Sequence, residues 1–248
     1  MSGNVVVDLS KYLNVYRFST VLPGNGQKVN FKPISTFQLK ELVSFDGDPD
    51  EALDNLINSC VIDENFDVRD LSLQDRFFLL VELRKRSKGE DYNINYNCVA
   101  CKGQVIDTLS LNKLKTKKLE NLNYVVKLDD NISVKLKLIT RNINLESVRL
   151  SNQLVETGKH KQQDRNIDEI ILGYLLCITS IITPDGIIDN PEINQVLEIF
   201  EQGPASFYDD VVKWFNALDF GVNFNIEIKC PHCKNKDKIE VPLENFFS

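Results

Sequence analysis

The hydrophobic positions of the first forty-five residues follow the period of a strand and then that of a helix. Segments 15–21 and 29–34 alternate between apolar and polar residues. The Leu-Pro-Gly-Asn-Gly sequence at 22–26 between them is rich in turn formers, so these two segments predict a β-hairpin. From Ser35 to Ser44 the apolar residues recur at helical spacing, and Ser35 is a typical N-cap.

Two more helices are predicted before residue 90. Asp50 is a candidate cap for a helix in which Leu53, Leu56 and Cys60 fall at helical spacing. The next helix spans about 72–86 and ends before Gly89. This helix carries Asp75 and Arg84, which we interpret as members of intrachain salt bridges at the helix surface, the alternative being a recognition surface.

The middle of the chain returns to strand patterns. Residues 92–111 read as extended structure around a turn, and segments 124–128 and 132–139 predict a hairpin that turns at 129–131, Asp-Asp-Asn. From Leu145 to Phe215 the spacing is helical throughout. The predicted helices lie near 144–157, 167–182, 191–202 and 204–217. The window 170–182 is the most apolar, and at 13 residues it predicts a buried core helix rather than a membrane span.

An internal repeat is the strongest signal in the sequence. Residues 92–102, Tyr-Asn-Ile-Asn-Tyr-Asn-Cys-Val-Ala-Cys-Lys, align without a gap to residues 224–234, Phe-Asn-Ile-Glu-Ile-Lys-Cys-Pro-His-Cys-Lys. Each copy reads as a strand, a turn with two cysteines, and a second strand. We call each Cys-x-x-Cys turn a knuckle. Two such hairpins are the two halves of a zinc ribbon.

The repeat sets the expected organisation of the chain. We predict an α+β fold in which small antiparallel β-hairpins form a split four-cysteine zinc ribbon, separated by a mostly helical insertion. The N-terminal α+β region covers 1–143 and holds the first knuckle, and the helical insertion covers 144–218. The C-terminal strands cover 219–248, and their knuckle packs on the first.

Composition limits the class of protein. Hydrophobic residues make up 42% and charged residues 26% of the 248 residues, which is usual for a globular protein with a sizeable core. The formal net charge of −7 argues against a general nucleic-acid binder. Residues 1–8 show no secretory signal, so we expect a cytosolic setting in which thiols stay reduced.

Four of the six cysteines stand at metal-binding spacing. The thiolates of Cys98, Cys101, Cys230 and Cys233 can fill the tetrahedral shell of one structural Zn²⁺. The gap between ribbon halves is usually about 15–20 residues, so here the ribbon must carry a long insertion. Disulfides are disfavoured in a cytosol, and a thioredoxin-type site requires the motif at a helix N-terminus. Ligation by His232 is the minor alternative, and a site lost or half-occupied in this chain also stays open.

Catalytic machinery is thin in this sequence. His160 lies in the polar loop 158–166, and no phosphate-binding, metalloprotease or serine-hydrolase motif is present. Asp185 and Asp189 lack the ligand spacing of an EF-hand, so a turn followed by a helix cap is the better interpretation. We therefore predict no catalytic residues and no organic cofactor.

The order of features resembles the T4-like bacteriophage baseplate hub proteins. The resemblance rests on residues 22–36, Leu-Pro-Gly-Asn-Gly through Ile-Ser-Thr, on Leu71-Ser-Leu-Gln-Asp75 running to Arg84, and on 92–101. It implies a late viral protein made in the host bacterial cytoplasm, which is either an assembly factor or a hub component kept in the virion tail baseplate. It also implies other baseplate and tail hub proteins as partners, and no catalytic residues.

Two functions therefore remain open at the level of the sequence. The first is an interaction protein of the baseplate hub, stapled by structural zinc, with no membrane partner and no expected nucleic-acid partner. Most of its aromatic residues are expected in the core, with Phe246 and Phe247 as the exceptions because they end the chain. The second is a zinc-ribbon viral regulatory factor that binds nucleic acid through lysines near the knuckles. Those lysines are Lys102, Lys229, Lys234, Lys236 and Lys238.

Overall fold

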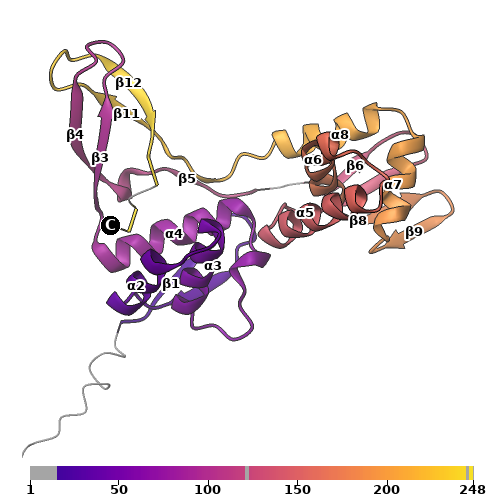
Figure 1. The fold of residues 1–248 in the computed structure, drawn as a ribbon, viewed down its shortest axis with the longest axis horizontal. Coiled ribbons are helices and arrows are strands. Elements are labelled where there is room, and N and C mark those ends of the chain that lie inside the picture. The colour runs from indigo at the N-terminus through magenta and orange to yellow at the C-terminus, as the bar shows by residue number, and fades with distance from the viewer. Residues whose placement is uncertain (1–15, 121–122, 244–245, 248) are drawn as a thin grey trace, which may run out of the picture. The chain divides into compact units, whose positions relative to one another are not determined.

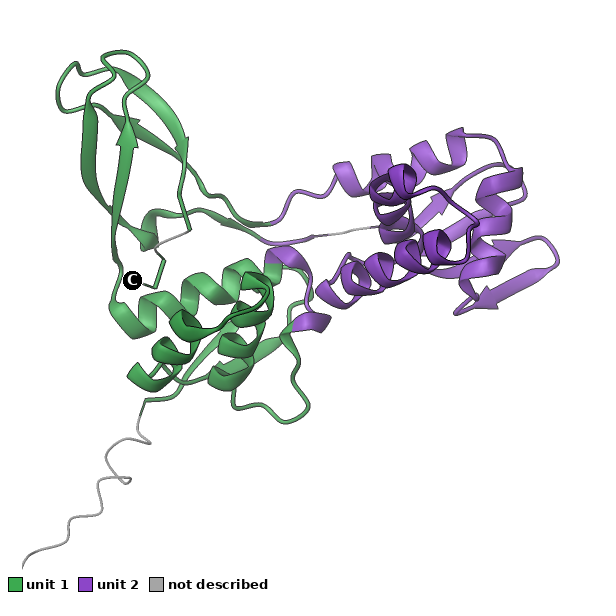
Figure 2. Ribbon diagram, in the orientation of Figure 1, with its two compact units in different colours: residues 1–68, 75–117, 221–248 green, residues 69–74, 118–220 purple. Residues whose placement is uncertain are grey.

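The computed structural model describes residues 16–120, 123–243 and 246–247. Residues 1–8, which bear on the expected absence of a secretory signal, lie outside this part of the chain. The chain divides into two compact units (Figure 2). Unit 1 comprises 1–68, 75–117 and 221–248, and unit 2 comprises 69–74 and 118–220. Unit 2 is therefore an insertion between the two halves of the predicted ribbon.

Unit 1 opens with the predicted hairpin and helices (Figure 1). Strands β1 (Phe18–Val21) and β2 (Lys28–Phe31) pair antiparallel and precede α2 (Thr36–Ser44). Ser35 caps α2, as predicted, and Gln38 completes a capping box. Helix α3 (Pro49–Cys60) starts one residue before the predicted cap, because Asp48 accepts a hydrogen bond from the Asp50 backbone and Pro49 fits the first turn.

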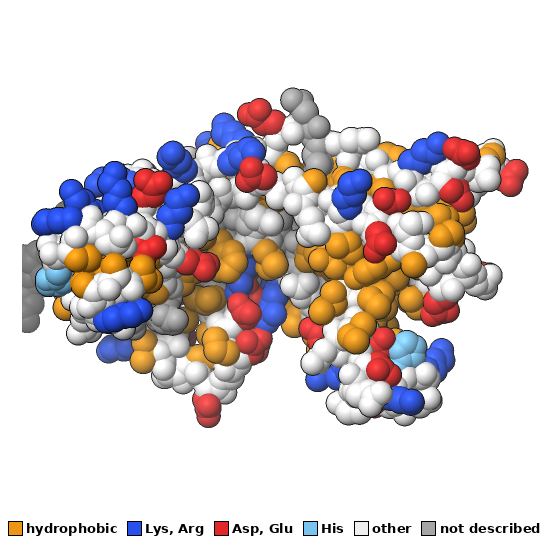
Figure 3. Space-filling model, turned by 90° about the horizontal axis from the view of Figure 1, so that it is seen from above, with side chains coloured by type: hydrophobic (Ala, Val, Ile, Leu, Met, Phe, Trp, Pro, Cys, Tyr) orange, Lys and Arg blue, Asp and Glu red, His pale blue; other side chains and the backbone are white. Residues whose placement is uncertain are grey.

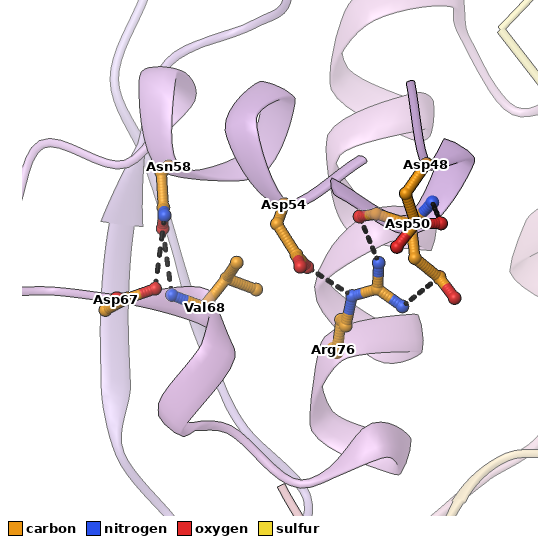
Figure 4. Close-up of polar contacts among 7 residues, drawn as sticks. All are labelled: Asp48, Asp50, Asp54, Asn58, Asp67, Val68 and Arg76. Carbon is orange, nitrogen blue, oxygen red and sulfur yellow. Dashed lines mark hydrogen bonds and ion pairs between the residues drawn. The ribbon is translucent and has the colours of Figure 1, made fainter. Parts of the chain in front are cut away.

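Helix α4 (Leu73–Lys88) follows the short η1 (Val68–Asp70). The salt bridges of this helix were predicted at the surface, and that position is wrong because the charged side chains are buried. Asp75, Arg76 and Arg84 are all buried. Arg76 points its guanidinium at α3, where Nε donates to Asp54 at 2.8 Å and Nη1 to Asp50 at 3.0 Å (Figure 4). Nearby, Asn58 accepts from the Val68 backbone N–H at 2.8 Å (Figure 4). A buried charge needs such partners, and they fix α4 against α3.

The ribbon region of unit 1 consists of two separate hairpins. Strands β3 (Asp91–Asn97) and β4 (Gln104–Ser110) form the first, and β11 (Asn225–Lys229) and β12 (Lys236–Glu240) the second. Both are antiparallel, with Tyr92 opposite Leu109 and Asn225 opposite Glu240. The sequence repeat thus folds as predicted.

Two short strands join the ends of the insertion. After η2 (Leu111–Lys113), strand β5 (Thr116–Lys117) pairs antiparallel with β10 (Gly221–Val222), so the chain leaves and re-enters unit 1 at neighbouring positions. The Asn223 backbone N–H extends this pairing by donating to the Lys115 carbonyl at 2.8 Å. The hairpins are therefore close in space despite their distance in sequence.

The C-terminal segment shows that the expected exposure of Phe246 is wrong. Phe246 is 2% exposed and lies edge-on to Tyr92, with ring centroids 5.2 Å apart. Its carbonyl accepts a hydrogen bond from Arg84 Nε at 2.7 Å, and the Pro242 carbonyl accepts from the Tyr92 hydroxyl. Phe247 is partly buried against Phe246. These contacts bury Phe246, and the sequence near it gives no indication of its distant partners.

The described residues of unit 2 form a four-stranded antiparallel sheet and four helices of eight residues or more. The strand order is β6 (Val125–Lys127), β7 (Ser133–Leu136), β8 (Ile178–Thr183) and β9 (Gly186–Asp189). The helices are α5 (Arg141–Glu156), α6 (Arg165–Leu175), α7 (Ile193–Gln202) and α8 (Ser206–Asn216), with η3 (Gln162–Asp164) between α5 and α6. Val134, Leu136, Ile181 and Phe207 are among the buried residues of its core.

The helix predicted over 167–182 is wrong beyond Leu175. Residues 178–183, Ile-Thr-Ser-Ile-Ile-Thr, form β8 instead, paired with β7 on one side and β9 on the other. These residues are mostly β-branched, which suits a strand flanked on both sides, and a short apolar run does not reveal its own period. Asp189 lies in the resulting hairpin and accepts a hydrogen bond from the Ser180 hydroxyl at 2.7 Å. The turn predicted around Asp185 is confirmed as the link between β8 and β9. The helix cap predicted to follow it is wrong for Asp189, which ends β9, because Glu192 caps α7.

The pairing of β7 with β8 also determines where unit 2 begins. The predicted insertion, 144–218, lies within it, but the long segment of unit 2 starts at residue 118 because β6 and β7 share a sheet with β8 and β9. No helix in the described ranges is both long enough and apolar enough to cross a membrane.

Candidate metal centre

Both knuckles close with the same backbone hydrogen bonds. In the first, the Cys98 N–H donates to the Gly103 carbonyl at 3.0 Å and the Lys102 N–H donates to the Cys98 carbonyl at 2.8 Å. The equivalent bonds of the second run from Cys230 to Asn235 at 2.9 Å and from Lys234 to Cys230 at 3.0 Å. The repeat therefore extends from sequence to hydrogen bonding.

A left-handed residue closes each turn. Lys102 has φ of 58° and Lys234 has φ of 63°, in the region that side chains other than glycine seldom adopt. Each lysine directly follows the second cysteine of its knuckle, and the strand resumes after it. This tight reversal lets both cysteines of a knuckle face the same point.

The four cysteine sulfurs converge from the two hairpins. Cys98 Sγ lies 3.6 Å from Cys233 Sγ, and Cys101 Sγ lies 3.8 Å from Cys230 Sγ. All four sulfurs lie within 4.8 Å of one another. A tetrahedral ion with metal–sulfur bonds of about 2.3 Å requires sulfurs about 3.8 Å apart. The four residues predicted as ligands are thus close enough together to bind one metal ion.

Burial and charge differ among the four thiols. Cys98 and Cys230 are buried against Val105 and the partly buried Tyr96, whereas Cys101 and Cys233 are exposed. Hydrogen bonding by the Cys101 backbone N–H lowers the pKa of Cys98 from 9.0 to about 6. At Cys98 the knuckle backbone therefore favours the thiolate, the form that binds metals. At Cys233 the hydrogen bond from the Asn235 backbone is outweighed by desolvation and by hydrogen bonds with the other three thiols, and the pKa is raised to about 11.

The remaining candidates stand apart from this cluster. His232 Nε2 donates to the Gln104 carbonyl at 3.3 Å, which links the two hairpins, and His232 is not among the clustered ligand atoms. Cys60 and Cys177 are buried elsewhere, and burial raises the pKa of Cys177 to about 12. Those two thiols are consequently apolar core residues rather than ligands.

The knuckles lie in a lysine-rich surface. Lys102, Lys229, Lys234, Lys236 and Lys238 are all exposed. Basic side chains gather in this way on the face drawn in Figure 3. Two contacts elsewhere in the chain were not predicted from the sequence. They are the hydrogen bond from Arg84 to the Phe246 carbonyl and the pairing of His160 Nδ1 with Asp168 at 2.8 Å. Neither has a sequence signal, because each depends on residues brought together by packing.

Two knuckle hairpins that share one four-thiol cluster define an α+β protein with a zinc-ribbon-like arrangement. The chain belongs to the family described as T4 bacteriophage base plate protein, whose model matches residues 14–248. The protein therefore has a structural role in a bacteriophage tail baseplate and interacts with other baseplate proteins. Comparison with curated proteins and with solved structures gave no match.

Proposed function

We propose that this protein is a non-enzymatic component or assembly factor of the baseplate hub, held in shape by one structural zinc ion. The observation that carries the proposal is the convergence of the sulfurs of Cys98, Cys101, Cys230 and Cys233 within 4.8 Å of one another. Four thiolates complete the coordination shell, so no position is left for a water molecule or a substrate. The ion acts as a staple between the hairpins.

The staple matters because the hairpins share no strand pairing. Each is a two-stranded sheet, and an isolated two-stranded hairpin is marginally stable in water. The knuckles are also 132 positions apart in sequence, and the folded unit 2 lies between them. The free energy of metal binding holds the two hairpins together and stabilises both.

Metal analysis tests the first half of the proposal. Protein purified without chelator is expected to contain one zinc per chain, measured by elemental analysis together with native mass spectrometry. Iron is the other metal that tetrahedral sulfur ligands favour, and the same measurement distinguishes it. Metal-free protein in which all four knuckle thiols react with a maleimide would contradict the site.

Association with individual baseplate proteins tests the second half. The chain is co-expressed with each hub and tail protein of its phage in turn, and co-elution is measured at low and high salt. A complex based on buried apolar contacts is expected to survive moderate salt. Absence of any such complex, together with salt-resistant binding to DNA or RNA, would contradict the hub function.

The nucleic-acid alternative has one observation in its favour, the exposed lysines around the knuckles. Base stacking also needs exposed aromatic rings, yet Tyr92 is 4% exposed and the Tyr96 hydroxyl is buried. With a net charge of −7, any affinity for a duplex is expected to disappear as salt screens the lysines. We therefore favour protein partners.

A further inference from the structure

A groove in unit 2 lies outside the metal centre. It is about 390 Å³ in volume and lies among α6, α7 and the start of α8. The buried side chains of Leu172 and Leu175 are part of its lining, and the partly buried Leu197, Phe200 and Tyr208 line it as well. The lining is thus largely apolar, as expected of a site that binds hydrophobic side chains.

The edge of this groove is acidic. Asp168 pairs with His160, but Glu201 and Asp209 are exposed and, within the described residues, form no ion pair. Glu201 lies in the last turn of α7, which contains no basic residue to offset the negative end of the helix dipole. A cation placed here gains from two carboxylates and from the helix end.

The acidic character extends along the chain around the groove. Residues 185–219 contain eight Asp or Glu residues and a single Lys. Figure 3 shows hydrophobic side chains gathered next to acidic side chains, a histidine and some basic side chains on the face that it draws. Lys159 and Lys161 flank His160 in the sequence and are exposed, but the lining of the groove itself contains carboxylates and no Lys or Arg. An apolar groove lined by carboxylates indicates a partner with positive charge.

We infer that this groove binds an amphipathic helix of another baseplate protein, with apolar anchors in the groove and Lys or Arg beside them. Helices presented to a groove place such anchors at i, i+3, i+4 and i+7, so one face carries both the apolar contact and its basic flank. The inference rests on the proposed function in one respect: it takes the natural partner to be a baseplate protein.

Matched substitutions separate the groove from the rest of the surface. Ala205 lines the groove at one end of α8 and Ala217 lies at the other end, and both are exposed. Ala205→Trp fills the groove without disturbing the core, and Ala217→Trp is its control. Glu201→Lys combined with Asp209→Lys reverses the charge of the edge, and Glu198→Lys on the exposed face of α7 is the matching control.

The direct test uses the full-length protein and a defined probe. The probe is a fluorescein-labelled peptide of about four turns with Leu at i, i+3, i+4 and i+7 and Lys elsewhere, and its twin carries Glu in place of Lys. Fluorescence anisotropy is expected to show binding of the Lys peptide that weakens at least about tenfold in Ala205→Trp and in the charge-reversed variant. The two controls are expected to stay within about twofold, and the Glu peptide to bind at least about tenfold more weakly.

Each outcome decides a different claim. Unchanged peptide affinity in Ala205→Trp would show that the groove is not the binding site. If the wild-type chain sediments as a dimer and Ala205→Trp as a monomer, the occupant of the groove is a second copy of this chain. The inference that another baseplate protein binds there would then be wrong. If no baseplate protein co-elutes with the wild-type chain while the Lys peptide still depends on Ala205, the groove stands and the proposed function fails. If co-elution is unaffected by Ala205→Trp, the function stands and the groove is not its interface.

Discussion

Buried arginines explain much of how unit 1 holds its parts. Arg84 is 6% exposed, and its guanidinium donates to the carbonyls of Phe246, Gly89 and Asp91. Burial lowers the pKa of Arg84, and the three carbonyl acceptors replace the hydration that the guanidinium loses. One side chain thus joins the end of α4, the start of β3 and the C-terminal segment.

Arg76 allows a quantitative test of a buried ion pair. Arg76→Met removes the guanidinium next to the buried Asp54 carboxylate, whose side chain is 4% exposed. We expect the free energy of unfolding, measured with urea, to fall by about 3–5 kcal/mol. Arg149→Met is the control, because Arg149 pairs with Glu146 at the surface and little change is expected there. Equal effects of the two substitutions would contradict the role assigned to Arg76.

The four knuckle cysteines, which are the proposed metal ligands, differ in kind from Cys60 and Cys177 in the core. Cys230→Ser removes one of four ligands, so the chain is expected to lose zinc and a large part of the stability that depends on it. Cys177→Ser changes a buried thiol that contacts the Gly173 carbonyl, and its zinc content is expected to stay at one per chain. Zinc content and melting temperature are measured for both variants. Equal melting temperatures with equal zinc contents would count against a shared site.

The pKa of Cys98 predicts how zinc affinity depends on pH. Zinc binds thiolates, so affinity falls as pH falls. Above a pH of about 6 the Cys98 thiol of the metal-free protein is already ionised, and below it binding must release one additional proton. A plot of log affinity against pH is therefore expected to steepen by about one unit as pH falls through 6. Competition with a chromophoric chelator measures this, and a constant slope from pH 5 to 8 would contradict it.

Among the structural elements, the two knuckle turns share the same backbone conformation. Both knuckles place a lysine in the left-handed region directly after the second cysteine, and both use the same two backbone hydrogen bonds. A non-glycine residue in this conformation stores strain of about 1–2 kcal/mol. The turn persists because the flanking strands and the converging thiols determine its path.

Lys102 tests this strain directly. Lys102→Val places a β-branched residue at φ of 58°, and the free energy of unfolding is expected to fall by about 1–2 kcal/mol. The same change at Lys236 puts valine into strand β12, where it fits, and little loss is expected. Denaturant unfolding of the zinc-loaded proteins measures both. The assigned turn would be contradicted by a larger loss at Lys236 than at Lys102.

For the whole molecule, the main consequence is that unit 2 interrupts the ribbon without separating its halves. Lys117 and Gly221 are direct partners in the β5–β10 pair, so the ends of the insertion are adjacent. Domain insertions are tolerated where the two chain ends of the inserted part lie close together. The thiols can therefore meet although a full compact unit lies between them in sequence.

Removing the insertion tests this arrangement. A chain in which Asn-Gly replaces residues 118–220 joins β5 to β10 by a two-residue hairpin. Stability is expected to fall, because residues 69–74 lose contacts such as the hydrogen bond from Asn142 to Asp70, but one zinc per chain is expected to remain. Elemental analysis and circular dichroism measure the result. A shortened chain that folds but binds no zinc would show that the metal site requires unit 2.

The sequence alone determined the local parts of this protein. The repeat, the knuckle spacing and the cap at Ser35 act over a few residues, so their chemistry is readable from order and spacing. The α+β class and the four clustered cysteines followed from them. The resemblance to T4-like baseplate proteins rested on the order of residues in 22–36, 71–84 and 92–101, and the family match to residues 14–248 confirms it at the level of the baseplate family.

Tertiary structure decided whatever depends on a distant partner. Residues 178–183 are a strand because β7 and β9 flank them, and their own apolar run fits helix and strand alike. Phe246 is buried because Arg84 and Tyr92, more than 150 positions earlier, form its site. Asp54 and Arg76 pair because α3 and α4 pack with both side chains inward. Burial and pairing of this kind depend on which segments meet, and that is a property of the folded chain as a whole.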